Sequence, residues 1–480
     1  MSIQINTGRK IGPCINTAIM IGLMVMGSFL PTVGDITALG MQVIGIFAGI
    51  IYGWSTMGMI IPSILGIFFI GILDGNNMVT TLTTAFGDRI ALCLLFFLIF
   101  SALIDKVGLS KYIANWCISR KMVAGRPWGI AIMFCMAAGI ISATVNLFAA
   151  MILMWGIFYS FCDEMEIRPQ EPYPAIVLIG IIYSASLCGG LFPFMGGSLI
   201  VIGQQLAFTG EEVNFIKFTL MQLVMILISA TAFFAIAKYV FKPDTSFMKN
   251  RAALNGKTLK MSADQKFVSF LLILTIFILF APGFLPSHWA AVTWLKSLDI
   301  AIVPALMVVF YYVYKSGRED KIGFEELMSK VNWDLIFMFA TVAVLSKAFI
   351  REDAGLMQFL NNSLSGLFSG MSPFVFVAVI ITIASITTQF ANNVAIILVF
   401  LPIMYGFAIA LGVDPFIVTV VSAFALNQAF ATPAASGPAA MIFSNKKWIP
   451  TKSAYLWGAI IFVINLCAAW IGTALAQLLV

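Results

Sequence analysis

The stretch GIISATVNLFAAMILMWGIFYSF, residues 139–161, is apolar almost throughout, but Ser142, Thr144 and Asn146 interrupt it without adding a charge. A hydroxyl or amide group that is buried in lipid costs free energy unless a partner satisfies it. The stretch therefore predicts a membrane-embedded element whose polar side chains bind something: neighbouring backbone, another helix or a ligand.

The composition of the whole chain agrees with this interpretation. Of its 480 residues, 61% are hydrophobic and 10% are charged, and the mean hydropathy is +1.01. A soluble domain is only about half apolar and about a quarter charged. We therefore predict an all-α, multi-pass protein of the cytoplasmic membrane with a cytoplasmic N-terminus. The net charge of +6 fits loop charges that set topology, so we expect a lipid bilayer and no nucleic acid as its surroundings.

Long apolar runs mark the predicted spans, because a helix needs about 20 mostly apolar residues to cross the hydrocarbon core. These runs cover residues 11–30, 37–54, 57–74, 89–107, 213–240, 266–283, 299–315, 333–350 and 453–479. The regions 127–161, 174–208 and 372–444 are apolar but interrupted. We interpret 127–161 and 372–410 as re-entrant hairpins, which leaves about eleven transmembrane helices and an external C-terminus.

The distribution of basic residues supports this topology. With a cytoplasmic N-terminus, all but five of the 27 Lys and Arg residues fall on the cytoplasmic side. The exceptions are Arg89, Lys217, Lys296, Lys347 and Arg351. Cytoplasmic loops are enriched in Lys and Arg, whereas Asp and Glu contribute little to orientation. Treating either hairpin as one full span would reverse the sidedness of the later loops and remove the asymmetry.

An internal repeat relates the two hairpins. The segment LIDKVGLSKYIANW at 103–116 corresponds to FIREDAGLMQFLNN at 349–362, and each of them precedes a hairpin. Asn146 follows Gly108 by 38 residues, and Asn393 follows Gly355 by the same 38 residues. An odd number of predicted crossings separates the copies, which places them in opposite orientations. This arrangement is the inverted repeat with broken helices that is found in secondary transporters.

Each hairpin is followed by an apolar segment that Gly or Pro interrupts. The first is YSASLCGGLFPFMGGSLIVIG, residues 183–203, and the second is ALNQAFATPAASGPAAMIFS, residues 425–444. Non-helical backbone at membrane depth is tolerated where it is buried in protein or lines a watery cavity. We therefore predict two broken spans, each paired with a polar hairpin tip.

Such tips and breaks expose helix N-termini, which attract anions, and carbonyl groups, which coordinate a small cation such as sodium. Neither the tips nor the breaks contain Lys, Arg, Asp or Glu, and this favours an anionic substrate over a cationic one. The alternative is purely structural: Ser142 and Thr144 bond carbonyls one turn back, and the amides of Asn146, Gln389, Asn392 and Asn393 link helices.

At these residues the chain resembles the divalent anion:sodium symporter (DASS, INDY-type) family of the ion transporter superfamily. TQFANNVAIILVFLP looks like the second hairpin signature, with Asn392, Asn393 and Val394 in its three places. AFATPAASGPAAMIF resembles the second broken span, where Pro438 is retained. GIIYSASLCGGLFPFMGGS resembles the first. One register of the first signature uses Ser142 to Thr144 and the other uses Val145 to Leu147; the 38-residue spacing favours the second.

The resemblance implies roles for particular residues. Substrate contact falls to the residues Asn146, Ser142, Thr144, Gly197, Asn392, Asn393, Ser436, Gly437 and Pro438. Contact with one of two sodium ions, each held between a tip and its broken span, falls to Gly196, Thr388, Ala391, Asn393 and Ala435. It also implies a homodimer and an elevator-like movement of the domain that carries the hairpins.

The predicted domains follow from this plan. They are 1–126 and 266–371 for the scaffold helices of the two repeats, 127–241 and 372–480 for the hairpins with their broken helices, and 242–265 for a basic cytoplasmic linker. The predicted function is secondary active transport of small di- or tricarboxylates such as succinate, malate, fumarate or citrate, coupled to sodium. The alternatives are sodium-independent dicarboxylate exchange and transport of an inorganic anion such as sulfate. We expect no enzymatic activity, no cofactor and no metal other than sodium, since the chain contains no phosphate-binding loop and no histidine cluster.

Overall fold

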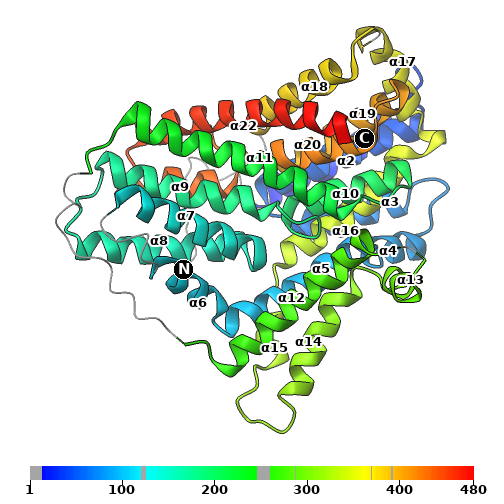
Figure 1. The fold of residues 1–480 in the computed structure, drawn as a ribbon. Helices are drawn as coiled ribbons and strands as arrows, with labels where there is room; N and C mark the ends of the chain where they lie inside the picture. The colour runs from blue at the N-terminus through cyan, green and yellow to red at the C-terminus, as the bar shows by residue number, and fades with distance from the viewer. Residues whose placement is uncertain are drawn as a thin grey trace. The chain divides into compact units, whose positions relative to one another are not determined.

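The computed structural model describes residues 13–119, 126–245, 260–286, 288–368, 370–390 and 393–479. Within these ranges the regular structure is helical, and one isolated bridge joins Val33 to Ile36. Eight described helices are long and apolar enough to cross a membrane, or nine if α4 and α5 count as one bent span, and shorter apolar helices accompany them. The prediction of an all-α polytopic membrane protein is therefore confirmed (Figure 1).

The chain divides into two compact units, of which the first contains residues 1–92 and 332–369. Its helices are α1 (Pro13–Met26), η1 (Gly27–Phe29), α2 (Ala38–Thr56), α3 (Ile60–Gly71), α4 (Met78–Phe86), α16 (Trp333–Ile350), η5 (Glu352–Ala354) and α17 (Leu356–Phe368). Helix α2 packs between α1 and α3, and α16 packs on α3 and α4. The late helix α16 thereby completes the core that the first four helices begin.

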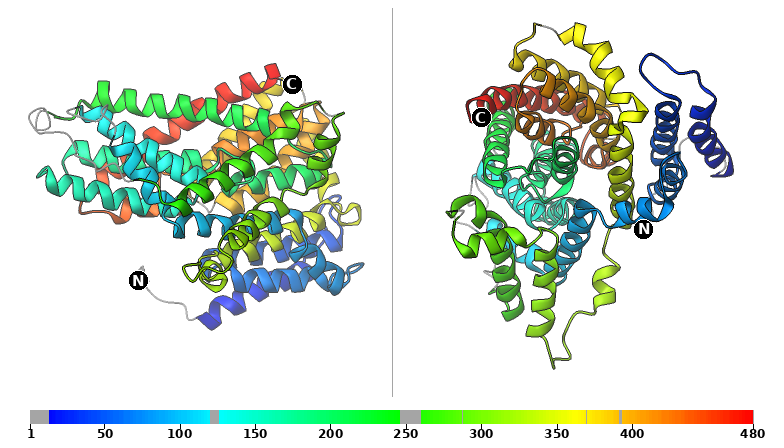
Figure 2. Two further views of the ribbon diagram at one scale, coloured as in Figure 1. Left: turned by 60° about the horizontal axis from the view of Figure 1, so that its bottom comes forward. Right: turned by 90° about the vertical axis from the view of Figure 1, so that its right-hand side faces the viewer.

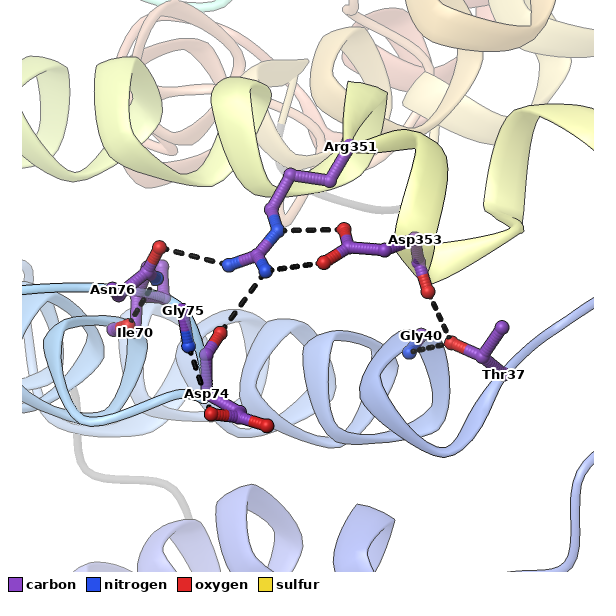
Figure 3. A network of polar contacts seen from close by, with 8 residues as sticks. All are labelled: Thr37, Gly40, Ile70, Asp74, Gly75, Asn76, Arg351 and Asp353. Carbon is purple, nitrogen blue, oxygen red and sulfur yellow. Dashed lines mark hydrogen bonds and ion pairs between the residues drawn. The ribbon is translucent and has the colours of Figure 1, made fainter.

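A polar network around Arg351 fastens the end of α16 in the first unit (Figure 3). The guanidinium group binds both carboxylate oxygens of Asp353, at 2.9 and 2.6 Å, and also donates to Asn76 Oδ1 at 2.8 Å and to the carbonyl of Asp74 at 3.0 Å. The hydroxyl of Thr37 donates to the Asp353 carbonyl. The hydrogen bond from Arg351 lowers the pKa of the Asp353 carboxyl below its usual value.

The second unit contains residues 93–331 and 370–480. Its first helices are α5 (Arg89–Lys106), α6 (Leu109–Ile118), α7 (Pro127–Thr144), α8 (Leu147–Glu164), α9 (Pro172–Gly189), α10 (Gly196–Thr209), α11 (Phe215–Ala235) and the π-helical η3 (Ile236–Phe241). The middle helices are α12 (Ala263–Phe284), α13 (Ala290–Ser297), α14 (Ile302–Tyr314) and α15 (Phe324–Met328). The last are α18 (Pro373–Thr388), α19 (Asn393–Ala410), α20 (Pro415–Ala425), α21 (Gly437–Ser444) and α22 (Thr451–Leu479).

The order of elements repeats along the chain. A long helix (α5 or α16) ends in a loop with Gly108 or Gly355, each at positive φ, 80° and 68°. A short helix follows (α6 or α17), then two antiparallel arms, a helix, a break and two more helices. Glycine adopts positive φ at little steric cost, so Gly108 and Gly355 each allow a tight turn of the chain. Opposite orientation of the two copies stays a prediction.

The predicted apolar runs each contain a helix whose ends lie within a few residues of the predicted bounds. The interrupted regions are helix pairs, with the breaks after Thr144, Gly189, Thr388 and Ala425. Arms α7 and α8 are 18 residues each and meet the length and composition of a membrane span. Their re-entrant arrangement therefore rests on the distribution of basic residues alone.

Buried polar side chains hold α20 at the centre of the second unit. Gln222 of α11 donates to the Val420 carbonyl at 2.9 Å, and the hydroxyls of Tyr405 and Thr419 are 2.7 Å apart. Helix α22 runs beside α11 and contacts α20 (Figures 1 and 2). All ten residues from Phe416 to Ala425 are buried, so the break that follows α20 starts from a fixed position.

Candidate functional site

The first hairpin turns at Val145 and Asn146, between α7 and α8. Asn146 is the N-cap of α8: its Oδ1 accepts hydrogen bonds from the N–H groups of Phe148 at 2.9 Å and Ala149 at 3.2 Å. Asn is among the preferred N-cap residues because its oxygen satisfies N–H groups that have no partner within the helix. The cap uses the side-chain oxygen, and a role of the Nδ2 donors in substrate binding stays a prediction.

Ser142 and Thr144 each have a hydrogen-bond partner in the protein. The Ser142 hydroxyl is buried and donates to the Ala185 carbonyl of α9 at 2.6 Å. The Thr144 hydroxyl donates to the Ile140 carbonyl, one turn back, at 2.7 Å. Ser142 therefore joins the hairpin to the neighbouring broken span, and Thr144 makes the local bond that the structural alternative predicts. A role of either hydroxyl in substrate binding stays a prediction.

The first broken span folds back tightly between α9 and α10. Gly196 has a φ of 52°, and a Cβ added to it would lie 3.0 Å from the Gly189 carbonyl oxygen. A Cβ at Gly189 would lie 3.0 Å from the Ser142 hydroxyl oxygen. The Ser198 hydroxyl donates to the Gly190 carbonyl at 2.8 Å. Only small residues fit here, and the N-terminus of α10 is brought against the first hairpin tip.

The second hairpin is fastened by Gln389, at the end of α18. Its Oε1 accepts hydrogen bonds from the N–H groups of Phe430 and Ala431, both at 3.0 Å, and its Nε2 donates to the Ser385 carbonyl at 3.0 Å. The Thr388 hydroxyl also donates to the Ser385 carbonyl, at 2.9 Å. The side chain of Gln389 thus ties the second tip to the second broken span, as expected of an amide that links segments.

Asn393 is the first residue of α19, and the preceding positions Ala391 and Asn392 lie outside the described residues. The Oδ1 of Asn393 is buried and has no hydrogen-bond partner within the described part of the chain. Leaving a buried acceptor unpaired costs about 1–3 kcal/mol. Such an oxygen at a helix start marks a position where a bound ion or ligand would supply the missing partner.

The second broken span ends where Ser436 caps α21. Its hydroxyl accepts from the Ala439 N–H at 3.1 Å and donates to the Ala429 carbonyl at 2.6 Å. Pro438 lies in the first turn, where its missing N–H is not needed, and is buried. Ala435 is buried as well. A Cβ added to Gly437 would lie 2.8 Å from Phe148 Cζ, so the start of α21 meets the start of α8.

Contacts join all four segments, which the sequence places far apart. The Gln428 amide of the second break donates to the Ser186 carbonyl of α9 at 3.2 Å. A Cβ added to Gly197 of the first break would overlap the side chain of Asn427 in the second. The tips and breaks therefore contact one another, helices α8, α10 and α21 begin at these contacts, and none of the four segments contains a charged residue. Partial positive charge at these ends favours an anion.

An apolar hollow lies beside the first tip. Its lining comes from the end of α7, the first break, α5 and α12, with the residues Phe97, Phe100, Ser101, Ile104, Ala143, Thr144, Phe192, Phe194, Met195, Leu272, Thr275 and Ile276. The rings of Phe97 and Phe194 stack with centroids 4.7 Å apart. We call it the aromatic hollow; its walls offer few partners for a carboxylate.

Three polar residues near the tips and breaks were not among the predicted binding residues. Asn427 and Gln428 lie in the second break, and Gln389 was considered only as a link between helices. The signal was present, because Asn427 and Gln428 directly follow a helix that is otherwise fully apolar or hydroxylated. The Gln428 amide donates to Ser186 of α9. The Asn427 amide donates to the Ala423 carbonyl of its own helix, and its side chain lies against Gly197.

Comparisons with known proteins identify the family of this chain. A sequence model described as citrate transporter (CitMHS) matches residues 47–425. The chain is 25% identical over 332 residues to the sodium-dependent dicarboxylate transporter SdcS of Staphylococcus saprophyticus, covering 66% of this chain and 63% of that relative, just under two thirds of its length. It is 23% identical over 459 residues to SdcS of Staphylococcus aureus strain MRSA252, covering 92% of this chain and 86% of that relative.

Among solved structures, the YdaH transporter of Alcanivorax borkumensis, described as having an unusual topology, matches with a TM-score of 0.57. The match covers 83% of this chain and 87% of that chain at 10% sequence identity. At this identity the likeness concerns the fold alone.

Proposed function

We propose that this chain, which belongs to the citrate transporter family, carries small di- or tricarboxylates across the cytoplasmic membrane as a secondary active transporter. It is a transport protein and not an enzyme. The proposed substrates are of the succinate, malate, fumarate and citrate class. The relatives named sodium-dependent dicarboxylate transporters support both the substrate class and sodium as the coupling ion.

One observation carries the proposal: two hairpin tips and two broken spans meet, and helix N-termini approach the region between them. A dicarboxylate has two separated anionic ends, and the tip at Asn146 and the tip at Asn393 offer an amide to each. Ser436 and the N–H groups at Gly197 would add donors. Donors without a full positive charge hold an anion while leaving it able to dissociate, which transport requires.

Sodium fits the second tip. A hard cation takes oxygen ligands, and the unpartnered, buried Oδ1 of Asn393 is such an oxygen. Thr388, Ala391, Asn393 and Ala435 are the residues that would hold the ion, some through their carbonyl groups. Homodimer formation and an elevator-like movement of the hairpins follow from the family resemblance and form part of the same proposal.

The test is uptake of labelled succinate and citrate by the purified full chain in proteoliposomes. We expect uptake that follows an inward sodium gradient and that unlabelled dicarboxylate inhibits. Uptake that is independent of sodium but requires internal dicarboxylate would identify the protein as an exchanger. If folded protein took up neither carboxylate under either condition, carboxylates would be excluded, and sulfate uptake would be measured next.

A further inference from the structure

The two pairs of hairpin tip and broken span use their oxygen atoms differently. In both pairs the tip contacts the break that follows it in the chain, the first through Ser142 and the second through Gln389. The family resemblance implies one sodium ion in each pair. Among the described residues, only the second pair has buried side-chain oxygens without a partner that could coordinate such an ion.

In the first pair, hydroxyl groups of the protein donate to three carbonyls of the tip and the broken span. Ser101 of α5 donates to the Val145 carbonyl, which is the turn of the tip itself. Ser142 donates to Ala185 at 2.6 Å, and Ser198 donates to Gly190 at 2.8 Å. Comparable bonds occur in the second pair, where Thr432 donates to the Gln389 carbonyl and Ser436 donates to the Ala429 carbonyl, so the two pairs differ in their unpartnered side-chain oxygens. No buried side-chain oxygen or nitrogen of the described residues 139–149 and 184–199 lacks a partner.

In the second pair, three buried oxygens have no hydrogen-bond partner within the described ranges: Ser385 Oγ, Asn393 Oδ1 and Gln428 Oε1. Ser385 is 4% exposed and Gln428 is 3% exposed. They come from the last turn of α18, the start of α19 and the second break, and Gln389 joins the first and the last of these segments. Buried acceptors without donors are suited to a cation, because an ion with oxygen ligands satisfies several of them at once.

We infer that the chain binds a single coupling cation, at the second hairpin pair, where buried side-chain oxygens have no partner among the described residues. This inference rests on the proposed function. It has an electrical consequence: a dianion that moves with one sodium ion carries one net negative charge. A membrane potential that is negative inside would therefore oppose uptake and favour release or exchange.

The first test counts bound ions directly. Radioactive sodium would be equilibrated with the purified full chain, and with the matched variants Asn146→Ser and Asn393→Ser, without any carboxylate. Ser keeps the cap of α8, and thermal unfolding would establish that both variants fold. We expect one sodium per wild-type chain, one in Asn146→Ser, and at least a tenfold loss of sodium affinity in Asn393→Ser.

The second test measures charge movement. Succinate uptake into proteoliposomes would be followed with an imposed potassium diffusion potential, at a pH where both carboxyl groups are ionised. We expect a Hill coefficient for sodium near one and slower uptake when the inside is negative. Two sodium ions per wild-type chain, a Hill coefficient near two, or loss of the ion in Asn146→Ser would overturn the inference.

Different results would refute the proposed transport function and the single bound cation. Carboxylate uptake without any bound sodium would refute the single cation and leave the transport function intact. One bound sodium in a folded chain that transports no carboxylate would refute the proposed function and support the cation site.

Discussion

Asn146 would combine two tasks in one side chain: its oxygen caps α8, and we propose that its amide donates to the substrate. Substitution can separate them. Asp caps a helix as well as Asn does, and its charge is favourable at a helix N-terminus, so Asn146→Asp should fold normally. The new carboxylate would repel the substrate, and like charges side by side cost several kcal/mol.

We therefore predict that Asn146→Asp reduces succinate uptake at least tenfold while its unfolding temperature stays close to that of the wild type. The matched control is Asn214→Asp, because Asn214 caps α11 with the same geometry, at 3.0 and 3.1 Å, outside the four segments. The control should transport normally. Equal uptake by both variants would remove Asn146 from the substrate site.

Gly197 of the first break packs so closely against the second break that a Cβ at this position would overlap the Asn427 side chain. Overpacking of this kind typically costs about 1–3 kcal/mol. We predict that Gly197→Ala lowers the unfolding temperature and that adding Asn427→Ala restores part of the loss. Gly156→Ala is the control: no atom lies within 4 Å of a Cβ at this helical position, so alanine should be neutral or stabilising. Purely additive effects of the two site substitutions would contradict the contact.

At the scale of elements, the hydrogen bonds of the Arg351 guanidinium group hold the end of α16 in place. Lysine cannot reproduce a bidentate pair, so Arg351→Lys loses one contact to Asp353 and those to Asn76 and Asp74. We predict a lower unfolding temperature at neutral pH. Arg318→Lys serves as the control, because Arg318 lies over the Tyr314 ring, a contact that lysine can also make.

The sign of the pH dependence follows from the lowered pKa of Asp353. A carboxyl whose pKa is depressed by folding stabilises the protein above its unfolded pKa, about 3.9, and this contribution is lost as the pH falls through the folded pKa. The difference between wild type and Arg351→Lys should therefore shrink in acid. Unfolding curves at several pH values in detergent would measure it; a difference that stays constant to low pH would show that Asp353 is not the partner that matters.

Helix positions are the part of the fold that the sequence predicts best. Apolar run length, Gly and Pro act within one or two turns, so the bounds of α16 and the break before Asn146 follow from local residues. Hydrogen-bond partners are different: Ser142 bonds Ala185, 43 residues away, and Gln389 bonds Phe430, 41 residues away. Such partners depend on tertiary packing, and for that reason the partners of Gln389 and the roles of Asn427 and Gln428 emerged only from the structure.

At the scale of the whole molecule, the repeat predicts that the two tips open to opposite sides of the membrane. Single cysteines at Asn146 and Asn393, introduced into a cysteine-free background, would be labelled in sealed vesicles with a reagent that does not cross the membrane. We expect labelling of one position from the cytoplasmic side and of the other from the outside. Labelling of both from one side would contradict the inverted topology and the re-entrant hairpins.

The central claim is that a carboxylate binds between the two tips and the two broken spans. The most direct measurement is a structure of the full chain in lipid nanodiscs, solved by electron cryomicroscopy with succinate and sodium. We predict succinate density between Asn146 and Asn393, next to the N-termini of α10 and α21. Density for succinate in the aromatic hollow, or elsewhere with the region between the tips closed, would contradict it.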